Sequence, residues 1–354
     1  MYGAPHAATP DPVVPDRETH TSKVRPSQAL ELGLDYLTGH NVPRDPVRAA
    51  QFLQQAAEAG VPEAQTRLGM MYQTGTGVSR DFSLAMHWYQ LAAASGGLAA
   101  KVNMATLYAR GNGVPRDSAM ALQMFHQAFE MGYGAAAAYL GEMYFAGTGV
   151  ARDRKAAEDW FTKGMKKHDP VSAYDLGILN TGEYGHKPDL PRAADMLRKA
   201  AKVNYVPAEY CLGLLIARHP DFGTSDEART WLDAASEAGF WKADAVLGIL
   251  SRDGDGVAKD PEKALYYFRL AVAQGGDSAL KLLGPDLKVL AARISPERAG
   301  QIADTAVAWA KSHPPLFLIV NSATGDMTIG GSLGNPDSPE AAAPQPAGGH
   351  PPRV

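Results

Sequence analysis

Residues 62–96, PEAQTRLGMMYQTGTGVSRDFSLAMHWYQLAAASG, contain one complete structural unit. In its first half, apolar side chains including Leu68 and Tyr72 recur at helical spacing, which predicts an amphipathic helix. Gly75 and Gly77 follow, and glycine gives the backbone the freedom to adopt the positive φ that ends a helix. The first half therefore predicts a helix that ends in a tight turn.

The second half of the unit predicts another helix. Asp81 stands where an N-cap is expected, because its carboxylate can accept hydrogen bonds from the free backbone N–H groups of the first turn. Ala85 and either Trp88 or Tyr89 fall on the side that we expect to be buried, and Gly96 marks the end. Small residues such as Gly69 and Ala85 allow the two helices to approach closely.

The same unit recurs along the chain every 36 residues. Four series of residues share this spacing, with a step of 35 in the sixth unit, where Thr224 and Glu227 form a capping-box pair. The series are Gly33, Gly69, Gly141, Gly177, Gly213, Gly248 and Gly284; Asp45, Asp81, Asp117, Asp153, Asp189 and Asp260; Gly60, Gly96, Gly132, Asn204, Gly239 and Gly275; and Ala49, Ala85, Ala121, Ala157, Ala193, Ala228 and Ala264. Seven two-helix repeats therefore span residues 28–276.

The recurring pattern resembles the Sel-one-like repeat (SLR) family, which is related to tetratricopeptide repeats. Residues 68–78 match it, as do residues 140–150 together with Asp153 and Trp160. Asn180 and Ile216 depart from it, because they replace the tyrosine of the first helix. The predicted fold class is all-α: a right-handed superhelical α-solenoid of about seven two-helix SLR repeats with a C-terminal helical cap.

The resemblance implies a non-catalytic scaffold. Similar proteins are adaptors in signalling regulation, envelope processes or endoplasmic-reticulum quality control, and they hold proteins or peptides along the solenoid. A subset with paired cysteines in each repeat is linked to penicillin binding, but this chain has one cysteine, Cys211. The expected function is a protein-interaction scaffold or adaptor in bacterial signalling or envelope regulation. A self-assembling envelope component is a further possibility, and the sequence leaves the oligomeric state open.

The regions outside the repeats differ in composition. Residues 1–27 are rich in Pro, Ala, His and Asp, which is typical of a disordered leader. Residues 277–313 predict a partial repeat and capping helices, with Ser295 before Pro296 as a helix start. Residues 314–354 comprise an apolar segment, Leu316–Val320, which we expect to fold back on the solenoid, and a disordered Pro/Ala/Gly-rich tail; a docking peptide is the alternative for that segment.

Composition excludes several classes of protein. A net charge of −4 and a pI near 6.2 argue against a general nucleic-acid binder. No apolar run approaches the roughly 20 residues of a transmembrane helix. Residues 1–19 lack the features of a secretory signal, so the default compartment is the cytoplasm, with the periplasm or export expected if the true N-terminus is missing.

Short catalytic motifs have structural explanations. Ser278 and Lys281 fit the S-x-x-K pattern of penicillin-recognising enzymes, so a β-lactam-binding or hydrolytic enzyme is the alternative function, although no S-D-N or K-T-G partner exists. Residues 330–334 fit G-x-S-x-G but lie in the Gly/Ser/Pro-rich tail. The histidines show no metal-ligand spacing, and we expect neither a metal nor a cofactor.

Binding candidates come from the first helices, which line the concave face of such solenoids. The positions that the apolar stripe does not use give six protein-binding candidates: Met70, Gln73, Phe145, Tyr174, Tyr210 and Arg252. Aromatic side chains at these positions can anchor a peptide. The alternative is that they close gaps between neighbouring repeats.

Overall fold

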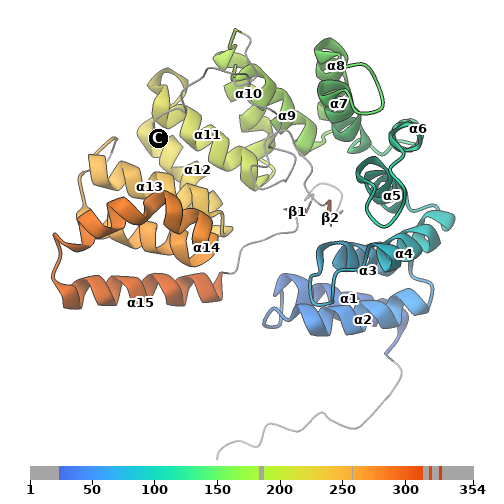
Figure 1. Cartoon of the computed structure of the whole chain (residues 1–354), viewed down its shortest axis with the longest axis horizontal. Coiled ribbons are helices and arrows are strands. Elements are labelled where there is room, and N and C mark those ends of the chain that lie inside the picture. Colours follow the sequence, from blue (N-terminus) through green and yellow to red (C-terminus); the bar gives the residue numbers. More distant parts are fainter. Residues whose placement is uncertain (1–23, 183–186, 257, 314–318, 321–326, 329–354) are drawn as a thin grey trace, which may run out of the picture.

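The chain folds almost entirely into helices (Figure 1). The computed structural model describes residues 24–182, 187–256, 258–313, 319–320 and 327–328. The helices are α1 (Pro26–Thr38), α2 (Pro46–Glu58), α3 (Pro62–Thr74), α4 (Phe82–Ala94), α5 (Leu98–Arg110), α6 (Ser118–Glu130), α7 (Ala136–Ala146), α8 (Arg154–Lys166), α9 (Pro170–Asn180), α10 (Leu190–Ala201), α11 (Val206–Arg218), the short 3₁₀ helix η1 (Pro220–Phe222), α12 (Ser225–Glu237), α13 (Trp241–Asp253), α14 (Pro261–Ala291) and α15 (Pro296–Ser312).

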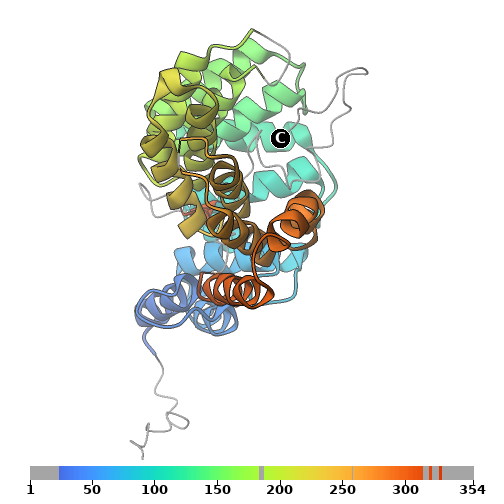
Figure 2. The same ribbon diagram turned by 90° about the vertical axis from the view of Figure 1, so that its left-hand side faces the viewer.

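Consecutive helices pack in pairs, and the pairs stack into an arc. The backbone of α14 breaks at Gly276, where φ is 56° and ψ is −138°, so residues 261–275 complete the seventh pair. Residues 277–291 then pack against α15, and the predicted cap is therefore an eighth helix pair. Figures 1 and 2 show the arc curving so that α15 returns toward the first pair. The all-α solenoid is confirmed.

The aspartates of the repeating series are N-caps of the second helices, as the sequence predicts. Asp45, Asp81, Asp117, Asp153, Asp189 and Asp260 each accept a hydrogen bond from a backbone N–H of the first turn of the helix that follows. The Asp81 N–H also donates to the carbonyl of Tyr72 at 2.8 Å, which ties the end of the turn to the helix before it. Each aspartate thus begins one helix and closes the preceding turn.

Where a turn has two glycines, they are needed for two separate reasons. Gly75 ends α3 in the left-handed conformation, with a φ of 76°, and its N–H donates to the carbonyl of Met71. The second glycine of the turn also packs against the preceding repeat: a Cβ on Gly113 would lie 2.6 Å from the Cβ of Phe82, the first residue of α4. Asn41 occupies this place in the first repeat with a φ of 62°. No helix pair precedes that repeat in the described chain, so a side chain is tolerated there.

The glycine in the middle of the first helix allows the close helix contact that the sequence predicts. A Cβ on Gly69 would lie 2.6 Å from Cε1 of Tyr89, which is fully buried. Phe161 and Phe268 fill the same space against Gly141 and Gly248. The sequence offered Trp88 and Tyr89 for the buried side of the second helix, and Tyr89 is therefore the one that lies in the core.

The tryptophans of the second helices lie beside the core rather than inside it. Trp88, Trp160 and Trp231 are half-buried. Each packs against a hydrophobic cluster, and the next residue along its helix is the one that is fully buried.

The sixth pair folds like the others despite its shortened turn. Thr224 caps α12 by accepting a hydrogen bond from the Glu227 N–H, as predicted. The Glu227 carboxylate does not complete the capping box and instead accepts hydrogen bonds from Arg198 of α10. The short turn is thus supported by an ion pair between neighbouring repeats.

The segments outside the repeats are described only in part. The array begins at Pro26, and residues 1–23 lie outside the described part of the chain. Within Leu316–Val320 the structure describes β1 (Ile319–Val320), which pairs antiparallel with β2 (Met327–Thr328). This two-stranded sheet lies on the inner side of the arc (Figures 1 and 2), and it is a small addition to the all-α prediction. The G-x-S-x-G motif and the predicted tail from residue 335 lie outside the described residues.

Candidate functional site: the inner face of the arc

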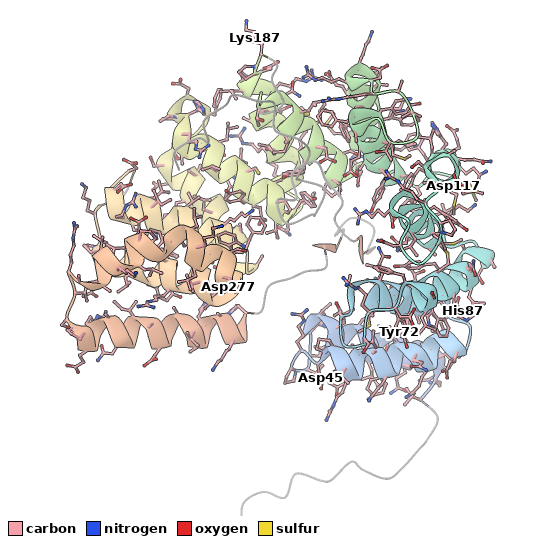
Figure 3. All side chains as sticks on the ribbon, in the orientation of Figure 1. Asp45, Tyr72, His87, Asp117, Lys187 and Asp277 are labelled. Atoms are coloured by element: carbon pink, nitrogen blue, oxygen red, sulfur yellow. The ribbon has the colours of Figure 1, made fainter. Side chains whose placement is uncertain are left out.

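The first helices face the inside of the arc in its N-terminal half. Figure 1 shows α1, α3, α5, α7 and α9 nearer to the centre than their partners. His87 and Asp117 of the second-helix layer point outward in Figure 3. The inner face is therefore built from first helices there, as the sequence predicts, and four of the six binding candidates belong to these helices.

Met70 and Gln73 of α3 are buried. Met70 is 2% exposed and belongs to the core shared by the first repeats. The Oε1 of Gln73 accepts a hydrogen bond of 2.7 Å from the hydroxyl of Tyr89. Both side chains therefore help to hold the second helix pair together.

Phe145 and Tyr174 are buried between neighbouring repeats. Phe145 is 7% exposed and shares a hydrophobic cluster with Leu176 of the next first helix, and the guanidinium of Arg152 lies 5.4 Å from its ring centroid. Tyr174 is 2% exposed, and its ring meets that of Tyr205 edge to face at 5.4 Å. Burial raises the pKa of the Tyr174 phenol well above its ordinary value. Here the structure favours the gap-closing interpretation.

Tyr210 and Arg252 are the two half-buried candidates. The ring centroids of Tyr210 and Phe240 lie 5.1 Å apart. Arg252 donates to Asp253 through two nitrogens, each at 2.7 Å, and pairs with Asp286 of the eighth helix pair at 2.9 Å. Both residues come from the sixth and seventh pairs, so the accessible part of the predicted site lies toward the C-terminal half of the arc.

First helices of neighbouring repeats also contact one another. The helices α3 and α5, α7 and α9, and α11 and α13 touch directly across the repeat boundary. Residues such as Met70 and Tyr174 therefore have neighbours on the adjacent repeat as well as within their own. A position that faces away from the other helix of its own pair can therefore lie either on an open surface or at the contact between two repeats.

Two buried carboxyl groups also occupy these repeats, and sequence reasoning did not identify them. Asp244 is 0% exposed; it accepts a hydrogen bond of 2.5 Å from the Ser236 hydroxyl and one of 2.9 Å from the Gln274 amide. Burial raises the pKa of Asp244 to about 8. Burial likewise raises the pKa of Glu209 to about 7. Both occupy the same position, four residues before the repeat glycine, so the shared register was a usable signal.

The alternative catalytic pair shows no assembled site. Ser278 and Lys281 are both exposed on residues 277–291, and no hydrogen bond joins them among the described side chains. In the described part of the chain, no group of three or more His, Cys, Asp or Glu side chains has the geometry to hold a metal ion. No helix within the described ranges is both long and apolar enough to cross a bilayer.

Comparison with known proteins identifies repeats that coincide with helix pairs of the structure. The Sel1 repeat family matches residues 29–61, 62–97, 98–133, 134–167, 170–205 and 241–276, which is more than half of the chain. The sixth helix pair, residues 206–240, and the eighth, after residue 276, lie outside these matches. No curated protein matches the chain.

A solved structure shares the fold. A protective antigen of uropathogenic Escherichia coli with an SLR fold has a TM-score of 0.58 and 23% identity, over 81% of this chain and 61% of the antigen, so the chain spans about three fifths of its length. A Sel1 repeat protein from Oxalobacter formigenes is 34% identical over 61% of this chain and 89% of its own, with a TM-score of 0.48. Yeast Tom70 is 14% identical over 85% of this chain and 68% of its own, with a TM-score of 0.41.

Proposed function

The chain belongs to the Sel1 repeat family, and from this premise we propose that it is a non-enzymatic scaffold that holds a protein or peptide partner against the inner face of the arc. Sel1 repeat proteins are generally protein-interaction scaffolds. We further propose that the partner acts in bacterial signalling or envelope regulation, which the resemblance to known adaptors supports.

One observation carries the proposal: in the described part of the chain, eight helix pairs stack one after another into an arc whose inner side is lined, in its N-terminal half, by one helix of each pair. Such an array presents a long continuous surface, because each repeat needs to pack only against its neighbours. The half-buried Tyr210 and Arg252, on the first helices α11 and α13 of the C-terminal half, offer a ring and a guanidinium, and both residue types are enriched where binding energy concentrates.

The test is affinity capture of the full chain from its native cell, with the double variant Tyr210→Ala and Arg252→Ala compared with the unmodified protein. Loss of two such anchors costs at least about 2 kcal/mol, so we expect recovery of a specific partner to fall at least about tenfold. Tyr174→Ala is unsuitable because Tyr174 is 2% exposed and the variant is expected to disturb the fold.

The matched control is Leu84→Ala, which removes a 39% exposed side chain from a second helix. This control is expected to retain the partner, and circular dichroism should show the same helix content in all three proteins. Equal recovery by the double variant and the control would contradict the proposed surface.

A further inference from the structure

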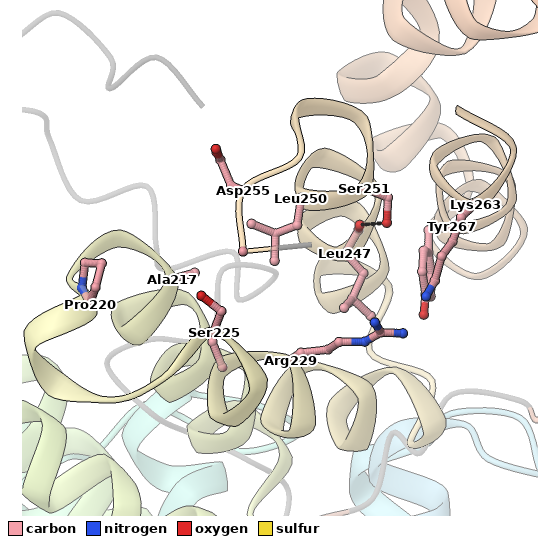
Figure 4. A pocket seen from close by; sticks show the side chains of 12 residues that line it. Ala217, Pro220, Ser225, Arg229, Leu247, Leu250, Ser251, Asp255, Lys263 and Tyr267 are labelled. Atoms are coloured by element: carbon pink, nitrogen blue, oxygen red, sulfur yellow. Dashed lines mark hydrogen bonds between the residues drawn. The ribbon is translucent and has the colours of Figure 1, made fainter. Parts of the chain in front are cut away.

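A cavity of about 250 Å³ lies between the sixth and seventh helix pairs (Figure 4). Its walls come from α11, α12, α13 and the first half of α14. None of the sequence motifs predicts it.

The cavity coincides with a break in the repeat pattern. The first helix of a repeat carries a tyrosine three residues after its glycine position, as at Tyr36, Tyr72, Tyr108 and Tyr144, and these rings pack against the hydrophobic clusters. The seventh repeat has Ser251 at this place. Ser251 is 4% exposed and its hydroxyl donates to the carbonyl of Leu247 at 2.8 Å, so the side chain stays against its own helix. Ser251 lines the cavity at a position where the first four repeats carry a tyrosine and the fifth and sixth carry Asn180 and Ile216.

One part of the wall is apolar. Ala217, Ala228, Leu247 and Leu250 contribute hydrocarbon surface from three helices. A cavity of about 150 Å³ with apolar walls already holds a benzene molecule. The volume between these repeats is therefore sufficient for one aromatic ring and a short polar group attached to it.

The other part of the wall is cationic. Figure 4 shows the polar ends of Arg229, Lys263 and Tyr267 gathered on one side, while the carboxylate of Asp255 points away from them. Asp233 pairs with Arg229 at 3.3 Å and accepts the Tyr267 hydroxyl at 3.3 Å, so it offsets one of the two positive charges. Lys263 makes no ion pair with any described residue; its ammonium nitrogen lies 5.9 Å from the Tyr267 ring centroid.

We propose that this cavity binds an aromatic ring that carries a carboxylate. The ring occupies the space left by Ser251, against Leu247 and Leu250, and the carboxylate pairs with Lys263. A half-buried cation without a partner gains most from an anion, because the pair forms where water is partly excluded. The carboxy-terminal aromatic residue of a peptide and a free aromatic acid share this chemistry. The inference does not depend on the proposed scaffold function, because the cavity is tested with small probes.

The experiment titrates the purified full chain by isothermal calorimetry with three probes: 3-phenylpropanoate, N-acetyl-Ala-Ala-Phe and its C-terminal amide. We expect saturable binding of both carboxylates and about tenfold weaker binding of the amide, because a charge-assisted hydrogen bond contributes about 1.5–3 kcal/mol. Binding of the peptide at least about tenfold tighter than 3-phenylpropanoate identifies a peptide terminus as the ligand, and equal affinity identifies a free aromatic acid.

Two variants locate the binding. Ser251→Tyr places the ring of the other repeats in the cavity and should abolish binding of all probes. Lys263→Gln should weaken the carboxylates about tenfold and leave the amide unchanged. The matched control Lys259→Gln removes an exposed lysine that does not line the cavity and should bind like the unmodified protein.

Circular dichroism and thermal melting first establish that each variant is folded. Absence of saturable binding by either carboxylate would overturn the proposal. The proposal would also be overturned if folded Ser251→Tyr bound the probes as tightly as the unmodified chain, or if Lys263→Gln weakened the amide as much as the acid.

Discussion

Glycine at the second turn position acts between repeats as well as within its own turn. Gly113, Gly149 and Gly256 each lie against the first residue of the second helix in the preceding repeat, namely Phe82, Ser118 and Ser225. The sequence predicts the positive φ of such glycines. It does not predict this contact, because the distance along the chain is about one whole repeat.

We expect Gly113→Ala to destabilise the protein more than Gly96→Ala. Both residues have positive φ, 69° and 87°, which costs an alanine about 1–2 kcal/mol. A Cβ at Gly113 also meets Phe82, whereas nothing lies within 4 Å of one at Gly96, so overpacking adds about 1–3 kcal/mol. Urea denaturation of the two variants measures the difference, and equal losses would show that the inter-repeat contact contributes nothing.

Asp244 makes the stability of the seventh repeat depend on pH. Its pKa is about 8 in the folded chain and about 3.9 when unfolded, so the folded state holds an extra proton between these values. Asp244 makes its full contribution to the free energy of unfolding below about pH 4. That free energy then falls as the pH rises toward 8, by a few kcal/mol at most. Glu209, with a pKa of about 7, acts in the same direction.

Asp244→Asn should remove most of this dependence, because the amide oxygen still accepts the Ser236 hydroxyl while the side chain no longer ionises. Thermal melts at pH 5, 7 and 9 measure the effect, and the exposed Asp226→Asn serves as the control. A melting temperature that falls equally in Asp244→Asn and the unmodified chain would assign the pH dependence to other groups.

At the scale of helices, periodicity predicted most of what the structure shows. Second helices begin directly after the aspartates, and several first helices end directly before a glycine. Seven pairs with a partial repeat and a helical cap were expected, and in the described chain that cap is an eighth pair. The pattern of the second helix alone left Trp88 and Tyr89 as alternatives for the buried position. The series Leu53, Tyr89, Phe125, Phe161, Leu197, Leu232 and Phe268 keeps the repeat spacing and lies 19 or 20 residues after the position of the repeat glycine, and it is this series that enters the core.

We expect the N-cap of α12, in the sixth helix pair, to contribute as much to the free energy of unfolding as the N-cap of α4, in a pair that the Sel1 family model matches. Asp81→Ala and Thr224→Ala each remove a side chain that accepts first-turn N–H groups, and each should lower the free energy of unfolding by about 0.5–2 kcal/mol. Asp81→Asn and Thr224→Ser keep the acceptor and should lose little. Chemical denaturation measures all four variants; a negligible loss in Thr224→Ala alone would mean that the Arg198–Glu227 pair, rather than the cap, fixes the start of α12.

At the scale of the whole molecule, the sequence predicted the solenoid but not the accessible part of its inner face. Burial at Phe145 and Tyr174 arises from contacts between neighbouring repeats, and those depend on how far each pair rotates against the next. A single sequence carries no direct record of that rotation. The cavity did have a signal, since Ser251 is the smallest side chain at the position where the first four repeats carry a tyrosine, but its cationic wall combines residues from two further helices.

The most direct measurement is site-specific photo-crosslinking in the native cell, with a photoreactive phenylalanine placed at Leu214 or Ile249, both half-buried on first helices, or at Gln90 on an outward second helix. If the arc holds a macromolecular partner along its first helices, Leu214 and Ile249 will give adducts with one and the same protein, and Gln90 will give none. Adducts that form equally from Gln90, or from that position alone, would contradict the account.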